Sequence, residues 1–303
     1  MESSSKINKA YQQGLVIRGH SSPIYCLDIS IDGFLYSGAG DRFLAKWNLE
    51  TGLQEKFSIQ FDSAVYCIKQ IGSTPYMAVG LNNGNIHIIN LNEKKEERLL
   101  KMSDSSVFSL NYSEKDELLF ATSGDSKLGI WHVPSFDSYQ MIQFSSGKIR
   151  ASILVDNEII IACQTGEIRR INFKELKETS RFQSHDDSVN CLKYWAEKNI
   201  IISGGKDATI NFNDLDKKEV AFSLVAHNFS VYDLVIQENS LLSASMDKSV
   251  KVWDMDNLEL KQKLAFPNVA GHKRSVNTLI KGRYENVFSA GDDGTIIEWK
   301  KYK

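Results

Sequence analysis

Short apolar runs of four to seven residues follow one another along the chain, separated by Gly, Asp, Asn and Ser. Residues 24–59 contain four such runs, which are Ile24–Ile29, Phe34–Ser37, Leu44–Leu49 and Leu53–Ile59. The turn signals between them are Asp32-Gly33, Gly40-Asp41 and Thr51-Gly52. This pattern predicts four short β-strands joined by tight turns. No stretch keeps a helical period beyond a turn or two, so we expect an all-β protein.

The unit of four runs occurs seven times. A tryptophan or a substitute for it ends the third run of each unit, at Trp47, Ile89, Trp131, Ile171, Asn213, Trp253 and Trp299, with spacings of 40 to 46 residues. A β-branched residue opens the first run, at Ile24, Val65, Val107, Ile149, Val189, Val231 and Val276, with spacings of 40 to 45 residues. Two independent positions therefore give the same count, and a period of this length is typical of repeat folds.

A set of polar residues recurs inside the units, and it identifies the repeat. The sets are His20, Ser37, Asp41 and Trp47; His185, Ser203 and Asp207; His227, Ser243, Asp247 and Trp253; and His272, Ser289, Asp293 and Trp299. The pairs Gly19-His20, Gly271-His272 and Trp253-Asp254 add the G-H and W-D signatures. In these motifs residues 12–303 resemble WD40 repeats, and the resemblance implies a closed seven-bladed β-propeller with four-stranded blades.

The two ends of the repeat indicate how the ring closes. The last unit stops at Trp299 to Lys303, directly after its third strand, whereas Gln13–Arg18 precedes the first unit without a partner. We therefore expect the N-terminal strand to become the outer strand of the last blade. The predicted organisation is a short tail at 1–11 and a single propeller at 12–303, although a prior of about 150 residues per domain would suggest two domains.

The histidine, serine and aspartate of each set invite a catalytic interpretation, because these are the groups used in acyl transfer. An active site is needed once, however, and this set recurs from unit to unit. The resemblance implies instead that the Asp accepts a hydrogen bond from the His in a network that includes the Ser hydroxyl and the Trp indole. Only His87 and His132 remain outside the sets. We expect a structural role for the sets, no metal and no cofactor.

Composition excludes several classes of function. Lys plus Arg is 36 and Asp plus Glu is 38, so the formal charge is −2 and there is no basic excess for nucleic acid or an anionic membrane. No segment reaches the roughly 18 apolar residues of a membrane span. Cys26, Cys67, Cys163 and Cys191 are far apart, without the spacing of zinc ligands, and we expect reduced, packed thiols. A cytoplasmic protein is predicted.

Candidate contact residues follow from the propeller geometry. The position after each strand-opening residue holds Tyr25, Tyr66, Phe108, Arg150, Asn190, Tyr232 and Asn277. Side-chain alternation should direct these residues toward the mouth of the central channel. Packing between neighbouring first strands is the alternative explanation for the four aromatic residues. The rim loops add Asp62, Asp104, Asp186 and Asp187 as one predicted group, and Lys206, Lys273 and Arg274 as another.

The leading functional hypothesis is a noncatalytic scaffold that binds a protein or peptide, of unknown identity, through its rim and channel mouth. It rests partly on family analogy, because a fold alone does not define a function. We expect a monomeric propeller within a larger assembly. One alternative is a propeller hydrolase or lyase with a metal in the channel, for which Asn190, Asn277 and Asp233 are the available ligands. The other is recognition of histone tails or a nucleic-acid-associated partner.

Overall fold

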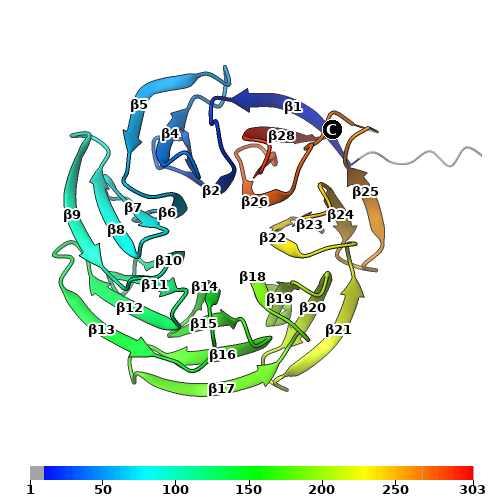
Figure 1. The fold of residues 1–303 in the computed structure, drawn as a ribbon. Helices are drawn as coiled ribbons and strands as arrows, with labels where there is room; N and C mark the ends of the chain where they lie inside the picture. Colours follow the sequence, from blue (N-terminus) through cyan, green and yellow to red (C-terminus); the bar gives the residue numbers. More distant parts are fainter. Residues whose placement is uncertain (1–9, 268, 303) are drawn as a thin grey trace, which may run out of the picture.

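Seven four-stranded antiparallel sheets surround a central channel (Figure 1). This computed structural model describes residues 10–267 and 269–302. In blades one to six the strands follow chain order outward from the channel, for example β2-β3-β4-β5 in blade one. The all-β class, the seven blades and the four strands of each blade are therefore confirmed.

The strands occupy equivalent places in successive blades. The innermost strands are β2 (Ile24–Ile29), β6 (Val65–Gln70), β10 (Val107–Ser113), β14 (Ile149–Val155), β18 (Val189–Trp195), β22 (Val231–Gln237) and β26 (Val276–Lys281). The second strands are β3 (Leu35–Ala39), β7 (Tyr76–Leu81), β11 (Leu118–Ser123), β15 (Glu158–Cys163), β19 (Ile200–Gly205), β23 (Ser240–Ser245) and β27 (Val287–Gly291). The third strands are β4 (Phe43–Trp47), β8 (Asn85–Asn90), β12 (Lys127–His132), β16 (Glu167–Asn172), β20 (Thr209–Asp214), β24 (Val250–Asp254) and β28 (Thr295–Lys301).

The outer strands are β5 (Gln54–Gln60), β9 (Lys95–Lys101), β13 (Ser138–Gln143), β17 (Lys177–Gln183), β21 (Glu219–Val225), β25 (Leu260–Leu264) and β1 (Tyr11–Arg18). Within the described residues the one helical element is the 3₁₀ turn η1 (Ala196–Lys198). No helix in this part of the chain has the length and apolar character needed to cross a bilayer.

Strand β1 completes blade seven. It pairs antiparallel with β28, with Gln13 opposite Trp299 and Ile17 opposite Ile296, in the sheet order β1-β28-β27-β26. Tyr11 and Ile17 are each 1% exposed. The predicted closure of the ring by the N-terminal strand is confirmed (Figure 1). Most of the expected tail at 1–11 lies outside the described residues, and β1 begins at Tyr11.

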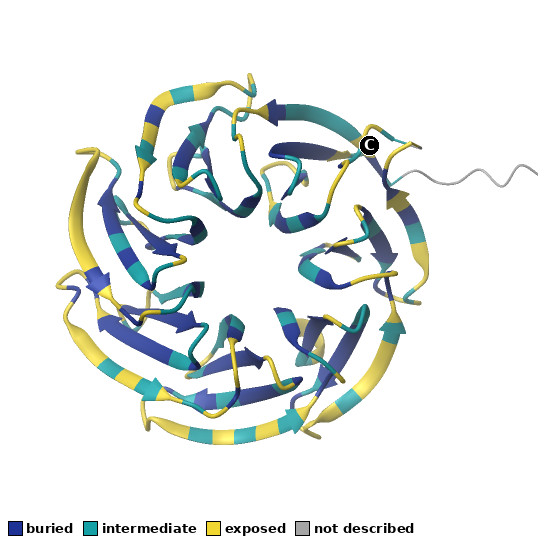
Figure 2. Cartoon of the chain, viewed as in Figure 1, coloured by how far each residue is buried: buried dark blue, intermediate teal, exposed yellow. Residues whose placement is uncertain are grey.

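Burial decreases from the second strand of a blade to its outer strand. All five residues of β3 are buried, whereas β9 has six exposed residues and one buried residue, Leu100 (Figure 2). The second strands have another blade on each face and are therefore buried along almost their whole length. Each outer strand has at most two buried residues.

The core consists of seven apolar clusters, one between each pair of neighbouring blades. The cluster between blades one and two, for example, joins Leu44 and Phe57 to Val65 and Val79. The cluster between blades seven and one contains Ile17 of β1 together with Ile24 and Phe288. Each blade is therefore stabilised by burial against two neighbours, and the ring has no unpaired end.

Three buried cysteines pack against glycines of the second strand. An added Cβ on Gly38, Gly80 or Gly204 would lie 2.7, 2.5 or 2.6 Å from the sulfur of Cys26, Cys67 or Cys191, respectively. The same Cβ would approach a valine of the next blade, at 2.3 Å for Gly38 and Val65. All four cysteines are free thiols and buried. Burial is the main cause that raises the pKa of Cys26, Cys67 and Cys191, so these thiols stay protonated and act as small packing groups.

Three of the four strands predicted for blade one differ from the structure by one or two residues at their ends. The third strand of blade one was expected to reach Leu49 but ends at Trp47. The side-chain oxygen of Asn48 accepts hydrogen bonds from the backbone N–H groups of Glu50 and Thr51 at 2.9 and 3.1 Å. This local turn competes with strand pairing, which is the usual effect of asparagine at such a position.

Candidate functional site

In blade six the recurring polar residues form one continuous network. Nε1 of Trp253 lies 2.9 Å from Oγ of Ser243, which in turn lies 2.7 Å from Nε2 of His227. Nδ1 of His227 lies 2.9 Å from Oδ2 of Asp247. Because an indole only donates and a carboxylate only accepts, the protons run in one direction: Trp N–H to Ser, Ser O–H to His, and His N–H to Asp.

The same arrangement occurs in blades one and seven. It links Trp47, Ser37, His20 and Asp41 in blade one and Trp299, Ser289, His272 and Asp293 in blade seven. All three serines and tryptophans are buried. The hydroxyl of each set is engaged on both sides inside its own blade, which supports a structural role.

Blade five keeps the network without a tryptophan. Nδ2 of Asn213 donates to Oγ of Ser203 at 2.9 Å, which is the contact that the indole makes in the other blades. His185 lies 2.8 Å from the same hydroxyl and 3.0 Å from Asp207. Asn213 is fully buried, and its amide also donates to the carbonyl of Ile201. A smaller side chain therefore replaces the indole as donor.

The network changes the acidity of its carboxyl groups. Burial by itself would raise the pKa of Asp207, but hydrogen bonds from His185 and Thr209 lower it to about 2. The pKa of Asp247 and that of Asp293 are likewise well below the usual range, since hydrogen bonds outweigh burial. Burial lowers the pKa of His227. In blade six, burial thus favours a neutral His227, and the hydrogen bonds favour an ionised Asp247.

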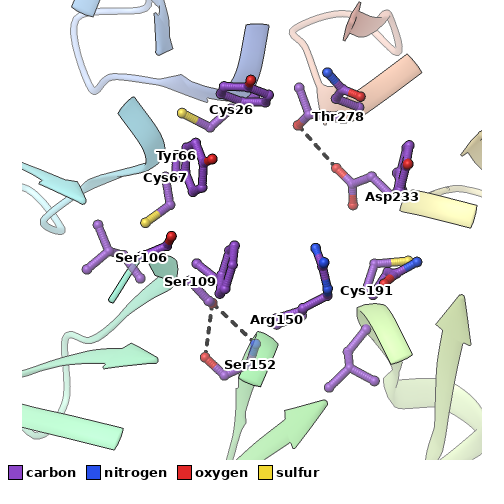
Figure 3. A pocket seen from close by; sticks show the side chains of 18 of the residues that line it. Cys26, Tyr66, Cys67, Ser106, Ser109, Arg150, Ser152, Cys191, Asp233 and Thr278 are labelled. Carbon is purple, nitrogen blue, oxygen red and sulfur yellow. Dashed lines mark hydrogen bonds between the residues drawn. The ribbon is translucent and has the colours of Figure 1, made fainter. Parts of the chain in front are cut away.

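The channel opens into a cavity of about 880 Å³, which we call the channel mouth (Figure 3). All seven residues predicted from the strand-opening position line it: Tyr25, Tyr66, Phe108, Arg150, Asn190, Tyr232 and Asn277. Arg150 and Asp233 enter it from different blades, as Figure 3 shows. The side-chain alternation of the inner strands thus brings these positions together in one place.

Three aromatic residues of blades one to three form a continuous surface, the aromatic arc, defined as Tyr25, Tyr66 and Phe108. The rings of Tyr25 and Tyr66 meet edge to face at 4.9 Å, and those of Tyr66 and Phe108 stack at 5.8 Å with 23° between their planes. The guanidinium carbon of Arg150 lies 5.3 Å from the centre of the Phe108 ring. The three aromatic side chains therefore pack against their neighbours in the next blade and also line the cavity.

Two glycines lie beside the aromatic arc. A Cβ on Gly40 would lie 3.5 Å from the ring of Tyr25, and one on Gly124 would lie 2.5 Å from Oγ of Ser105 and 3.2 Å from the ring of Phe108. Neither glycine has a positive φ, so the backbone does not require glycine at these positions. The rim therefore carries no side chain at these two positions beside the arc.

The sequence profile of the WD domain, G-beta repeat, matches residues 12–48, 176–214 and 218–254. The three segments end one residue after Trp47, Asn213 and Trp253, at the end of a third strand. With the seven blades, these matches decide the family. The chain is a WD40-repeat protein.

Several proteins resemble this WD40 propeller over most of its length. Kinesin-like protein KIF21A of Homo sapiens is 24% identical over 261 residues, which is 82% of this chain and 14% of the relative. Kinesin-like protein KIF21B of Homo sapiens is 27% identical over 318 residues, 93% of this chain and 16% of the relative. An uncharacterized WD repeat-containing protein of Schizosaccharomyces pombe is 20% identical over 255 residues, 79% of this chain and 69% of the relative. The propeller thus spans only a small part of the kinesin-like relatives.

The charged residues of the WD40 rim are not separated into two groups as expected. Nζ of Lys206 lies 3.0 Å from a carboxylate oxygen of Asp187, so these opposite charges are neighbours in blade five. Asp104 lies 3.0 Å from Nζ of Lys101. The amide of Asn83 donates to Asp62 at 3.1 Å. The predicted separation of acidic from basic residues is therefore wrong at Lys206, because the two loops of one blade meet. The other predicted rim residues Asp186, Lys273 and Arg274 are exposed.

The proposed channel ligands of an enzyme are engaged within the fold. Asp233 accepts hydrogen bonds from Oγ1 of Thr278 at 3.2 Å and from the backbone N–H of Leu279 at 2.8 Å (Figure 3). The amides of Asn190 and Asn277 donate to backbone carbonyls of the adjoining blades at 3.0 and 2.9 Å. Across residues 10–267 and 269–302, no three His, Cys, Asp or Glu side chains are grouped so that they could hold a metal ion.

Sequence reasoning missed three residues at this site. Asp292 lines the channel mouth and accepts from Nδ2 of Asn277 at 2.8 Å. Phe229 and Met246 are exposed on the rim of blade six, at 57% and 45%. A signal was available, because Met246 and Asp292 occupy the position before the repeat aspartate, where the other units have Gly, Asn, Gln or Lys.

Proposed function

We propose that this WD40 propeller is a noncatalytic interaction module that binds a protein or peptide through its channel mouth and the adjoining rim. The observation that carries the proposal is the aromatic arc, whose three rings contact one another in sequence and line a large cavity. Aromatic side chains in a concave site are typical anchors of an interface.

The recurring His, Ser and Asp sets support this proposal, because their polar groups form hydrogen bonds within the blades, which is a structural role. Each His, Ser and Asp of blades five, six and seven is engaged in a hydrogen-bonded network that joins a loop to a strand. A rigid ring with a preorganised mouth loses little conformational entropy on binding. We further propose that the propeller is a monomer that acts within a larger assembly. A cytoplasmic location is also proposed, and the four free thiols are consistent with a reducing compartment.

The experiment compares two faces of the same disc. Tagged wild-type chain, the double variant Tyr66→Ala with Phe108→Ala, and the double variant Ile31→Ala with Tyr284→Ala would each be used to capture partners from extracts of the native host. Ile31 and Tyr284 are 63% and 90% exposed in loops that join first and second strands, on the opposite rim. They are a matched control, because both variants remove two large apolar side chains.

We expect the wild type and the opposite-rim variant to retain the same partners, and the channel-mouth variant to lose them. Circular dichroism and melting temperature would show that all three chains are folded. Partners that are retained by the channel-mouth variant but lost by the opposite-rim variant would show that the opposite face is the binding surface, and the proposal would be wrong.

A further inference from the structure

Arg150 is a cation without a counter-charge at the centre of the channel mouth. Among residues 10–267 and 269–302, the arginines within 4.0 Å of a carboxylate oxygen are Arg98, Arg169, Arg170 and Arg181. Arg150 is not among them, although its side chain is half-buried and enters the cavity (Figure 3). Lys148, two residues earlier on the same blade, also lines the cavity and has no carboxylate within that distance in the described chain.

The position of Arg150 also determines which charge a ligand group can carry at the Phe108 end of the aromatic arc. Its guanidinium lies over Phe108 at 5.3 Å, so it occupies one face of the last ring. A second cation placed there would meet a like charge at close range, which costs free energy in a partly buried site. An arginine or lysine side chain inserted by a partner therefore does not suit blades three and four, whereas an anion does.

Two loops of each blade form the rim of the propeller, and the same backbone hydrogen bond joins them in all seven blades. In each blade a backbone N–H of the loop between the second and third strands donates to a carbonyl of the loop before the first strand, at 2.8 to 3.0 Å. The donors are Gly40, Asn82, Gly124, Gln164, Lys206, Met246 and Asp292. Side chains of the two loops therefore meet at equivalent places, as the ion pair of Lys206 with Asp187 shows.

In blade six these two places are occupied by Met246 and Phe229, both exposed. The backbone N–H of Met246 donates to Ser230 at 3.0 Å, and Oγ of Ser245 donates to the carbonyl of Phe229 at 3.1 Å, so the two loops are fastened together. Tyr232, three residues after Phe229, lines the channel mouth. Blade six therefore exposes two apolar side chains, Phe229 and Met246, on adjoining loops of the rim.

We propose that the partner is an extended peptide segment with an acidic side chain that binds Arg150 and an apolar side chain that rests on Phe229 and Met246. This inference rests on the proposed function of the channel mouth and adds the chemistry of the partner. Charge complementarity supports the first contact, because a carboxylate would give Arg150 a charge-assisted hydrogen bond that the described chain does not supply. The second contact removes two exposed apolar side chains from water.

The probe is a phage-displayed library of random 12-residue peptides, selected on immobilised full-length chain. We expect enriched sequences to contain Asp or Glu together with an aromatic or large aliphatic residue. Parallel selections would use Arg150→Gln, the double variant Phe229→Ser with Met246→Ser, and the opposite-rim double variant Ile31→Ser with Tyr284→Ser. The first two should fail to enrich the wild-type motif, and the third should enrich it unchanged.

A synthetic peptide of the enriched sequence then allows a charge exchange. By fluorescence anisotropy, Arg150→Gln should weaken binding about tenfold or more, and replacement of the peptide carboxylate by an amide should have the same effect. Arg150→Glu should bind a peptide with lysine at that position better than it binds the original peptide. Wild-type affinity in Arg150→Gln, or enrichment of basic peptides by the wild type, would overturn the inference.

The outcomes separate this inference from the proposed function. Binding that is lost in Tyr66→Ala with Phe108→Ala but unchanged in Arg150→Gln would leave the channel mouth as the binding surface and exclude the acidic contact. Binding that is lost only in the opposite-rim variant would exclude both. Enrichment no greater than on a blank surface would count against both as well, because a preformed mouth should select short peptides.

Discussion

Nδ1 of His227 donates a hydrogen bond to Oδ2 of Asp247 over 2.9 Å, and the histidine side chain is completely buried. Asp247→Ala would remove the carboxylate that accepts from that donor in the interior of blade six and leave only Oγ of Ser249, which lies 3.4 Å away. Because an unsatisfied buried donor loses its hydration without compensation, we expect the free energy of unfolding to fall by about 1 to 3 kcal/mol. Urea titration followed by tryptophan fluorescence would measure the change.

The control for this substitution is Asp137→Ala, which removes an exposed carboxylate 3.5 Å from the exposed side chain of Arg98. Exposed ion pairs of this kind contribute about 0 to 1 kcal/mol. Equal losses in the two variants would show that the network of blade six does not stabilise the fold as described.

Acid should destabilise the propeller through the same networks. The folded-state pKa of Asp207 is about 2, and those of Asp247 and Asp293 are also lowered, against about 3.9 for an unfolded aspartate. The stabilisation is therefore complete above about pH 4 and is lost as the pH falls through the folded-state values, at up to about 1.4 kcal/mol per pH unit for each group. The lowered pKa of His227 acts in the same direction, from about pH 6.5 downward.

Melting temperatures measured between pH 7 and pH 2 would test this dependence. We expect a shallow decrease below about pH 6.5 and a steep one below about pH 4. Asp247→Asn keeps an acceptor for His227 but has no titratable group, so its decrease below pH 4 should be smaller than that of the wild type. A wild-type melting temperature that is constant down to pH 2 would contradict the contribution of these carboxylates.

Gly80 and Cys67 are expected to be energetically coupled. A Cβ on Gly80 would lie 2.5 Å from the sulfur of Cys67 and 2.9 Å from Val107, so Gly80→Ala should overpack blade two and reduce stability by about 1 to 3 kcal/mol. Blade four has alanines at the two corresponding positions, Ala151 and Ala162. The double variant Cys67→Ala with Gly80→Ala should therefore recover much of the loss.

Chemical denaturation of the two single variants and the double variant gives the coupling energy directly. If the decreases in the free energy of unfolding of the two single variants add up to that of the double variant, contact with the Cys67 sulfur does not explain the glycine at position 80.

Closure of the ring by β1 predicts a large effect of truncation. Deletion of residues 1–18 removes the ladder with β28 and exposes the faces that Tyr11 and Ile17 cover. We expect a loss of several kcal/mol, and for the single substitution Ile17→Ala a loss of about 2 to 5 kcal/mol. Differential scanning calorimetry would record both. Gln12→Ala, on the exposed side of the same strand, should change little; a truncated chain that melts within a degree or two of the full chain would refute the role of β1.

The periodic part of the fold could be read from the residues alone. The spacing of Trp47, Trp131, Trp253 and Trp299 and of the strand-opening residues gave seven units, because each blade must bury the same faces against its neighbours. Closure was also predictable, since a unit that lacks its fourth strand leaves an unpaired edge. The positions facing the channel followed from strand alternation.

Contacts between different loops and blades could not be read in this way. The ion pair of Lys206 with Asp187 depends on how two loops of one blade fold back on each other, as does the joining of the loops that carry Phe229 and Met246. The position of Arg150 over Phe108 depends on how blades three and four are placed around the ring. The repeat encodes which faces are buried, because hydrophobic burial acts on every unit alike. The chemistry of the mouth is decided only when the ring closes, since side chains from seven separate segments then share one cavity.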